Sequence, residues 1–191
     1  MSIQSAIKDS IEVKHQILND SSLLSVIEKV ADAMFNALNQ GHKVLFCGNG
    51  GSAADAQHLA AELSGRFYFD RDPLPAEALH CNTSYLTAVA NDYGFDEVYA
   101  RAIKGSGCPG DLLVGLSTSG NSTNILKAFD AAKTKGMQTI AFTGKDGGLL
   151  KDKADFLLNI PSSDTARIQE SHIMVGHILC ELVEERLFGK K

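Results

Sequence analysis

The sequence contains no apolar run that approaches the ~20 residues needed to span a bilayer. It has no strongly basic stretch either, and its net charge of −5 argues against a nucleic-acid surface. Segment 1–14 lacks the apolar core of a signal peptide. The four cysteines are scattered and form no CxxC pair, which fits a reducing compartment. We therefore expect a cytoplasmic protein with neither a membrane nor a nucleic acid as partner.

The order of apolar patterns predicts the α/β class. Helical patterns cover about residues 2–18 and 21–40, with a break and cap at Asp20-Ser21-Ser22. Strands alternating with helices imply a parallel sheet covered on both faces. The last helix has a broader apolar face than one sheet needs, so it packs either against another subunit or deep in the core. The predicted strands are 43–47, 76–81, 111–116, 137–143 and 155–160, and the later helices are about 53–65, 83–103, 122–135 and 164–187.

Two predicted strand-to-helix turns have unusual composition. Three of the four residues 48–51 are glycine, so the backbone can approach a ligand closely and direct its N–H groups inward. The turn matches neither a Walker loop nor the dinucleotide spacing, and a plain tight turn is the alternative. The second turn, 117–122, carries four hydroxyls beside the N-terminus of a predicted helix, which suits a phosphate dianion. Simple helix capping would need only one hydroxyl.

Two pairs of polar residues lie on predicted helices. His58 and Glu62 are four residues apart and share one helix face. Gln169 and His177 are eight apart, and both side chains could reach a common point. Together the four would provide ligands for a divalent metal such as Zn²⁺. Two alternatives remain: a solvated surface pair, and metal-free acid–base chemistry by Glu62 and His177.

These motifs, in this order, resemble the phosphoheptose isomerase family within the sugar isomerase (SIS) domain superfamily. The resemblance covers nearly the whole chain. The Ser-Thr-Ser-Gly loop is shared by all SIS domains, whereas the His58/Glu62 and Gln169/His177 pairs are more specific to the isomerase. The matching segments are Gly48-Asn49-Gly50-Gly51-Ser52, Asp55-Ala56-Gln57-His58 with Glu62, Asn91-Asp92, 117–122, 143–148, and Arg167-Ile168-Gln169-Glu170 with His177.

The resemblance implies a single SIS domain over 1–191, with a helical segment at 1–40 before an α/β core and a long C-terminal helix. The fold would be a three-layer α/β/α sandwich whose five-stranded parallel sheet has a flavodoxin-like order. It further implies a homotetramer with active sites at subunit interfaces. The reaction would convert sedoheptulose 7-phosphate into D-glycero-D-manno-heptose 7-phosphate, the first step toward the ADP-heptose of lipopolysaccharide.

The resemblance also assigns residues. One Zn²⁺ per subunit would be held by His58, Glu62, Gln169 and His177, and Glu62 and Gln169 would also face the substrate. The sugar would contact Asn49, Gly50, Gly51, Asn91 and Asp92, and the phosphate would contact Ser117, Thr118, Ser119 and Ser122.

A ketose–aldose interconversion moves a proton between C1 and C2 through an enediol or enediolate. We expect Glu62 to be the base and His177 to serve the oxygen protons. One position departs from some family members, which carry Asp where this chain has Ala166; Asp164 is nearby. Two other SIS functions are alternatives: a non-catalytic protein that binds a replication initiator, and a sugar-phosphate sensor. Retention of Glu62 and His177 favours the enzyme.

Overall fold

Five parallel strands form the centre of the structure, a computed structural model that describes residues 2–189. Their order across the sheet is β2-β1-β3-β4-β5, the flavodoxin-like arrangement predicted from the resemblance. The chain order reverses between β1 and β3, and in such sheets ligands bind beyond the carboxyl ends of the strands at this point. The strands are β1 (Val44–Gly48), β2 (Ala76–Ala78), β3 (Leu112–Leu116), β4 (Gln138–Thr143) and β5 (Phe156–Asn159).

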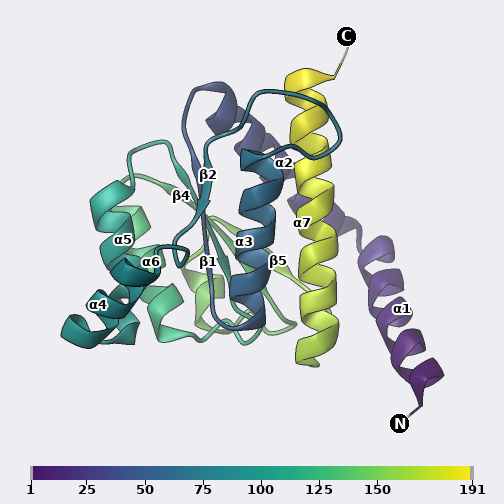
Figure 1. Cartoon of the computed structure of the whole chain (residues 1–191). Helices are drawn as coiled ribbons and strands as arrows, with labels where there is room; N and C mark the ends of the chain where they lie inside the picture. Colours follow the sequence, from purple (N-terminus) through teal and green to yellow (C-terminus); the bar gives the residue numbers. More distant parts are fainter. Residues whose placement is uncertain (1, 190–191) are drawn as a thin grey trace.

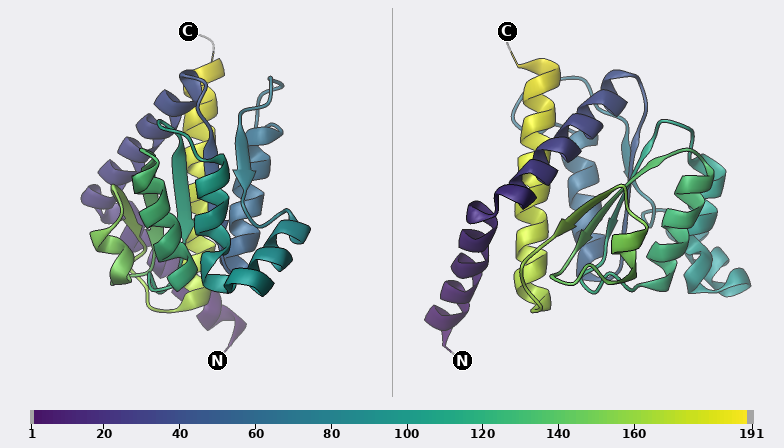
Figure 2. Two further views of the ribbon diagram at one scale, coloured as in Figure 1. Left: turned by 90° about the vertical axis from the view of Figure 1, so that its left-hand side faces the viewer. Right: turned by 180° about the vertical axis from the view of Figure 1, so that it is seen from behind.

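Helices cover both faces of the sheet (Figures 1 and 2). One apolar core lies between the sheet and α2, α3 and α7, and the other between the sheet and α5 and α6. The three-layer prediction is therefore confirmed. The helices are α1 (Ile3–Asn19), α2 (Ser21–Asn39), α3 (Gly51–Ser64), α4 (Thr83–Tyr93), α5 (Val98–Ser106), α6 (Thr123–Thr134) and α7 (Thr165–Phe188), with short 3₁₀ helices η1 (Phe95–Glu97) and η2 (Gly148–Asp152).

The single helix predicted for 83–103 is wrong. Gly94 follows α4 with a φ of +90°, a backbone conformation that side chains with a Cβ rarely adopt. This residue ends α4, and the chain continues through η1 into α5. The break between the first two helices was predicted correctly, because Asp20 accepts hydrogen bonds from Ser22 N and Leu23 N and so caps α2.

The long helix α7 is packed between α2 and α3 and places the site residues of the last segment against α3 (Figure 1). Val175, Leu179 and Val183 are buried in this packing, whereas Ile178 is 38% exposed. Most of the broad apolar face is therefore used within the chain. Across residues 2–189, no helix combines the length and apolar character needed to cross a bilayer.

Helix α1 extends away from the body of the molecule (Figure 2). Its polar contacts with α7 include the hydrogen bond that Ser10 Oγ donates to Glu170 Oε2 at 2.7 Å. Lys14 Nζ lies 3.9 Å from the same oxygen, and Arg167 NH1 donates to the carbonyl oxygen of Ala6. Three isoleucines at a spacing of four residues form an exposed stripe along α1. They are Ile3, Ile7 and Ile11, which are 82%, 54% and 48% exposed.

Candidate active site

Close packing of α3 against α7 brings the two predicted polar pairs into one region. At the contact, a Cβ added to Gly176 would lie only 2.5 Å from Leu59 Cδ2, so glycine lets the two backbones approach. His177 follows Gly176 on α7, and His58 precedes Leu59 on α3. The close approach therefore sets the two histidines side by side.

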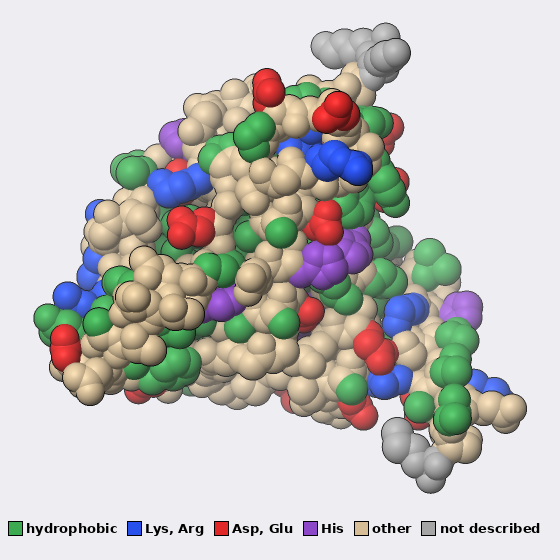
Figure 3. All heavy atoms as spheres, viewed as in Figure 1, with side chains coloured by type: hydrophobic (Ala, Val, Ile, Leu, Met, Phe, Trp, Pro, Cys, Tyr) green, Lys and Arg blue, Asp and Glu red, His purple; other side chains and the backbone are tan. Residues whose placement is uncertain are grey.

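His58, Glu62 and His177 form a compact cluster on the surface of α3 and α7. His58 Nε2 lies 3.0 Å from Glu62 Oε1 and 3.3 Å from His177 Nε2. One ligand atom from each residue lies within 4.8 Å of the other two. Histidine side chains form a patch in the middle of this face of the molecule, with acidic atoms beside it (Figure 3).

The donor set of this cluster fits a divalent metal. Two imidazole nitrogens and a carboxylate oxygen are ligands that zinc accepts at bond lengths of about 2.0–2.2 Å. Ligand atoms on a tetrahedral zinc of that size stand about 3.3 Å apart, close to the separations seen here. The two nitrogens also face each other, and a hydrogen bond between them needs a proton on one ring. A cation would satisfy all three lone pairs at once.

The side chain of Gln169, on α7, lies against the first turn of α3. A Cβ on Gly51 would be 2.6 Å from Gln169 Nε2 and 2.9 Å from Oε1, so the carboxamide rests directly on the glycine turn. Residue 51 therefore has to be small for α7 to reach the turn. The structure thus places Gln169 between α3 and α7 like the cluster, and its role as a fourth ligand stays a prediction.

The loop between β3 and α6 is held in shape by its own polar groups and by a neighbouring loop. Ser122 is the N-cap residue of α6, but within the described part of the chain its hydroxyl caps no N–H; it lies 3.0 Å from Ser117 Oγ. Gly120 has a φ of +68°, and a Cβ there would lie 2.1 Å from Gly147 O. Capping thus does not explain the hydroxyls of this loop.

A cleft of about 300 Å³ opens beside this loop. Thr118 and Ser119 contribute to it, and the loop after β4 and the start of α7 form its other walls. Among the described residues that line the cleft, Lys145 is the one that carries positive charge. Sequence reasoning gave Lys145 no role, although its motif belongs to the resemblance. The lining residues are Thr118, Ser119, Asn121, Gly144, Lys145, Asp146, Gly148, Ser162, Ser163, Thr165 and Ile168.

A reciprocal amide pair joins the glycine turn to the first turn of α6. Asn49 Nδ2 donates to Asn124 Oδ1 at 2.9 Å, and Asn124 Nδ2 donates to Asn49 Oδ1 at 2.8 Å. Asn124 is only 2% exposed. Its role was missed from the sequence, where it reads as an ordinary residue in the first turn of a helix. The pair thus ties the glycine turn to the start of α6.

The remaining predicted residues are exposed or otherwise engaged. Asn91 and Asp92 are exposed at the end of α4, where Asn91 Nδ2 donates to Asp92 Oδ1 at 2.9 Å. Asp164 caps α7, because its Oδ1 accepts from Ala166 N at 2.8 Å and from Arg167 N at 3.2 Å. This capping role explains the carboxylate of Asp164, two positions before Ala166. His172, which was left out of the predicted site, is fully buried and lies 3.1 Å from Thr143 O.

Comparison with known proteins identifies the family. The model of the SIS domain matches residues 8–144. The phosphoheptose isomerase of Clostridium acetobutylicum is 51% identical over 189 residues, which are 99% of this chain and 96% of that protein. This chain belongs to the phosphoheptose isomerase family. A second member of the family, from Mycobacterium tuberculosis, is 54% identical over 96% of this chain and 93% of its own length.

Solved structures of the phosphoheptose isomerase family have the same fold as this chain. GmhA from Neisseria gonorrhoeae superposes with a TM-score of 0.90 at 43% identity, covering 96% of this chain and 97% of that one. The phosphoheptose isomerase from Francisella tularensis gives a TM-score of 0.92 at 39% identity over 96% of each chain. The predicted fold and family resemblance are thus confirmed.

Proposed function

We propose that this chain is an aldose–ketose isomerase that converts sedoheptulose 7-phosphate into D-glycero-D-manno-heptose 7-phosphate. The observation that carries the proposal is the cluster of His58, Glu62 and His177, in a chain about half identical to phosphoheptose isomerases over nearly its full length. The product would enter ADP-heptose synthesis for lipopolysaccharide. We further propose that the whole chain is one SIS domain and acts in the cytoplasm.

Glu62 and His177 would each carry out one part of the proton transfer. Glu62 Oε1 is the oxygen that faces His58, so we assign Oε2 to the carbon-bound proton that moves between C1 and C2. We assign the oxygen protons to His177. A carboxylate has two oxygens, and this division lets Glu62 contact a metal and the substrate together.

His58, Glu62 and His177 would hold a single Zn²⁺, with the Gln169 oxygen as the fourth ligand. Such an ion supplies positive charge that stabilises negative charge developing on the substrate oxygens. The carboxamide of Gln169 lies on Gly51, which supports its approach to both the ion and the substrate.

The phosphate would bind in the cleft beside the loop after β3. Thr118 and Ser119 line the cleft, and their hydroxyls would donate to the phosphate together with those of Ser117 and Ser122 in the same loop. The N-terminus of α6 would add the positive end of a helix dipole. These groups carry no full positive charge, whereas the phosphate is a dianion. We assign Lys145, which lines the same cleft, as its counter-charge.

We propose that four copies assemble with active sites at their interfaces. The apolar stripe of Ile3, Ile7 and Ile11 leaves area on α1 that a second copy would cover. Asn91 and Asp92 are exposed on α4, and together with Asn49, Gly50 and Gly51 they would complete the sugar site.

The proposal is tested by incubating the protein with sedoheptulose 7-phosphate in deuterated water, with and without a chelator. We expect turnover with deuterium incorporation at the reacting carbon, and loss of both in Glu62→Gln. Exchange that survives in Glu62→Gln would remove Glu62 as the base. Absence of turnover in the native protein under both conditions would overturn the isomerase assignment in favour of a binding protein.

A further inference from the structure

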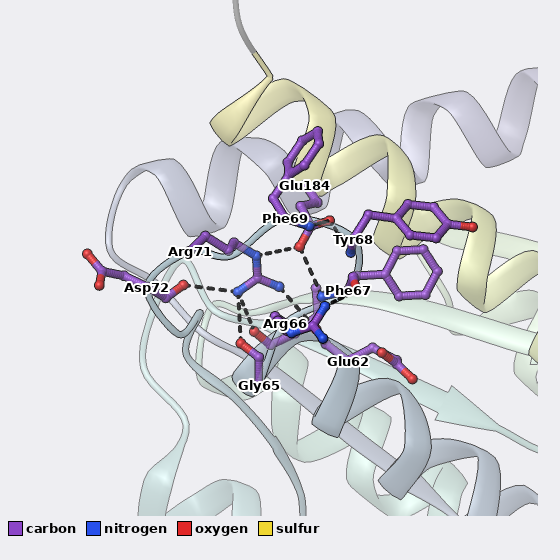
Figure 4. Close-up of polar contacts among 10 residues, drawn as sticks. Glu62, Gly65, Arg66, Phe67, Tyr68, Phe69, Arg71, Asp72 and Glu184 are labelled. Carbon is purple, nitrogen blue, oxygen red and sulfur yellow. Dashed lines mark hydrogen bonds and ion pairs between the residues drawn. The ribbon is translucent and has the colours of Figure 1, made fainter.

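A buried ion pair connects the segment after α3 to α7 (Figure 4). Arg71 Nε donates to Glu184 Oε1 at 2.7 Å, and the two side chains are 2% and 1% exposed. Glu184 also accepts hydrogen bonds from three successive backbone N–H groups, those of Phe67, Tyr68 and Phe69, at 2.6–3.0 Å. Burial by itself raises the pKa of Glu184, but these hydrogen bonds and that from Arg71 outweigh it and lower the pKa. The carboxylate is therefore held ionised.

The guanidinium of Arg71 is also bonded to the end of α3. Its NH2 group donates to the carbonyl oxygen of Glu62 at 3.0 Å, and NH1 donates to that of Leu63 at 3.0 Å. Carbonyls in the last turn of a helix have no partner within the helix, so they are free to accept these bonds. Because one planar group contacts both sides, Arg71 ties the C-terminal end of α3 to Glu184 on α7.

This pair touches the proposed catalytic cluster at two points. The first is the backbone of Glu62 itself. The second is Phe67, whose N–H is held by Glu184 and whose ring centroid lies 5.7 Å from that of His177. Glu184 also lies seven residues after His177 on the same helix, about 10 Å along its axis.

Stability alone is a weak reason for such a pair. Removing two charges from water is costly, and well-packed apolar residues often stabilise a protein equally well or better. Apolar side chains, however, make no directional contacts that fix how two helices are oriented. Arg71 bonds Glu184 through Nε and the end of α3 through NH1 and NH2, so this planar group fixes the separation and the rotation of α3 relative to α7. The geometry of His58 and His177 is sensitive to both.

We propose that Arg71 and Glu184 form a positioning clamp that sets the geometry of the His58–Glu62–His177 cluster, with Phe67 transmitting the clamp to His177. The clamp holds the ligand atoms at the spacing that a metal ion and the substrate require. The geometry of the clamp rests on the contacts described above. Its effect on catalysis rests on the proposed function.

The test compares Glu184→Gln and Arg71→Lys with a matched control, Asp111→Asn. Asp111 is likewise 2% exposed, accepts from two backbone N–H groups and pairs with Lys43 Nζ at 2.6 Å. It precedes β3 at the amino end of the strand, away from the cluster. Each protein is examined for zinc affinity by competition with a chromophoric chelator, for the visible spectrum of its Co²⁺ form, for kcat and KM, and for unfolding by urea.

We expect the two clamp variants to bind zinc about 10–100-fold more weakly, as loss of groups that orient metal ligands does elsewhere. Their Co²⁺ spectra change and kcat falls, while KM changes little because the phosphate cleft is built from other residues. Asp111→Asn loses comparable stability but keeps its zinc affinity within about twofold, since distant sites act independently.

Clamp variants whose zinc affinity, spectrum and kcat match those of Asp111→Asn would overturn the proposal. If Glu184→Gln fails to fold, Arg71→Lys and Phe67→Leu decide by the same comparison, because Phe67→Leu keeps the N–H to Glu184 and removes only the ring beside His177. Failure of the proposed function would appear separately, as absence of turnover in the native protein. The ratios of zinc affinity between variants do not depend on turnover.

Discussion

Replacing Gly176 with alanine is expected to separate α3 from α7 and to weaken the contact between His58 and His177. The new Cβ would lie 2.5 Å from Leu59 Cδ2 and 2.6 Å from Cδ1, whereas ordinary contacts are 3.4–4 Å. The new Cβ and the Leu59 side chain must therefore move about 1 Å apart. Leu59 is only 2% exposed, so its side chain has little room to change rotamer. Since a misplacement of about 1 Å can cost roughly 10²-fold in rate, kcat should fall by a factor between ten and a hundred.

Two effects on stability oppose each other in this variant. Alanine is favoured over glycine in a helix by about 1 kcal/mol, while overpacking a core costs about 1–3 kcal/mol. We expect a net loss of about 1 kcal/mol in the free energy of unfolding, measured by urea titration. Gly105→Ala in α5 is the control, because a Cβ there would meet no described atom within 4 Å; it should gain about 0.5–1 kcal/mol. Equal stabilisation of both variants, with native zinc affinity in Gly176→Ala, would refute the reasoning.

Three further predictions concern the cleft, the metal and a buried histidine. Lys145→Met should raise KM for the sugar phosphate about tenfold, the worth of one charged hydrogen bond, with kcat unchanged; an unchanged KM would exclude Lys145 from phosphate binding. Chelation should abolish turnover, and added zinc should restore it in the native protein but not in His177→Ala. Burial lowers the pKa of His172 to about 4, so the unfolded chain takes up this proton first as the pH falls below about 6.5. The free energy of unfolding should therefore drop between pH 6.5 and 4, by up to about 3 kcal/mol; in His172→Gln this part of the drop should vanish, and a pH dependence identical to the native one would contradict the assignment.

Much of the fold was predictable because its signals are local. Most strands are short, mainly apolar runs, and β1 and β3 are buried at every position, as expected for a parallel sheet between two helical layers. The prediction failed at 83–103, where apolar periodicity continues through Gly94. Only the backbone conformation of that glycine, with its φ of +90°, divides the segment into α4 and α5.

The candidate site was predictable in its parts but not in its assembly. The spacing of His58 and Glu62 places them on one helix face, yet nothing in it says that His177 lies 3.3 Å from His58. That meeting depends on the crossing of α3 and α7 at Leu59 and Gly176, a tertiary contact between residues more than a hundred positions apart. The family resemblance supplied what the spacing lacked.

Residues that act through a partner were the hardest to find. Arg71 and Glu184 are 113 positions apart. In the sequence alone, nothing distinguishes them from charged residues on a solvated surface. Lys145 looks like any exposed lysine until the loops after β3 and β4 are placed around one cleft. The roles proposed for these residues rest on their tertiary surroundings, which a single sequence does not encode at the position itself.

The Asn49–Asn124 pair constrains how the sequence of this family can change. Each side chain donates to and accepts from the other, so the match depends on both being carboxamides. Asn49→Asp alone would set an acceptor against an acceptor, and Asn124→Leu alone would leave the other amide without its partner. An intermediate with one change is thus less fit than either end state. Among relatives, we expect the two positions to change together or not at all. An alignment in which they vary independently would show that the glycine turn and α6 are not coupled through them.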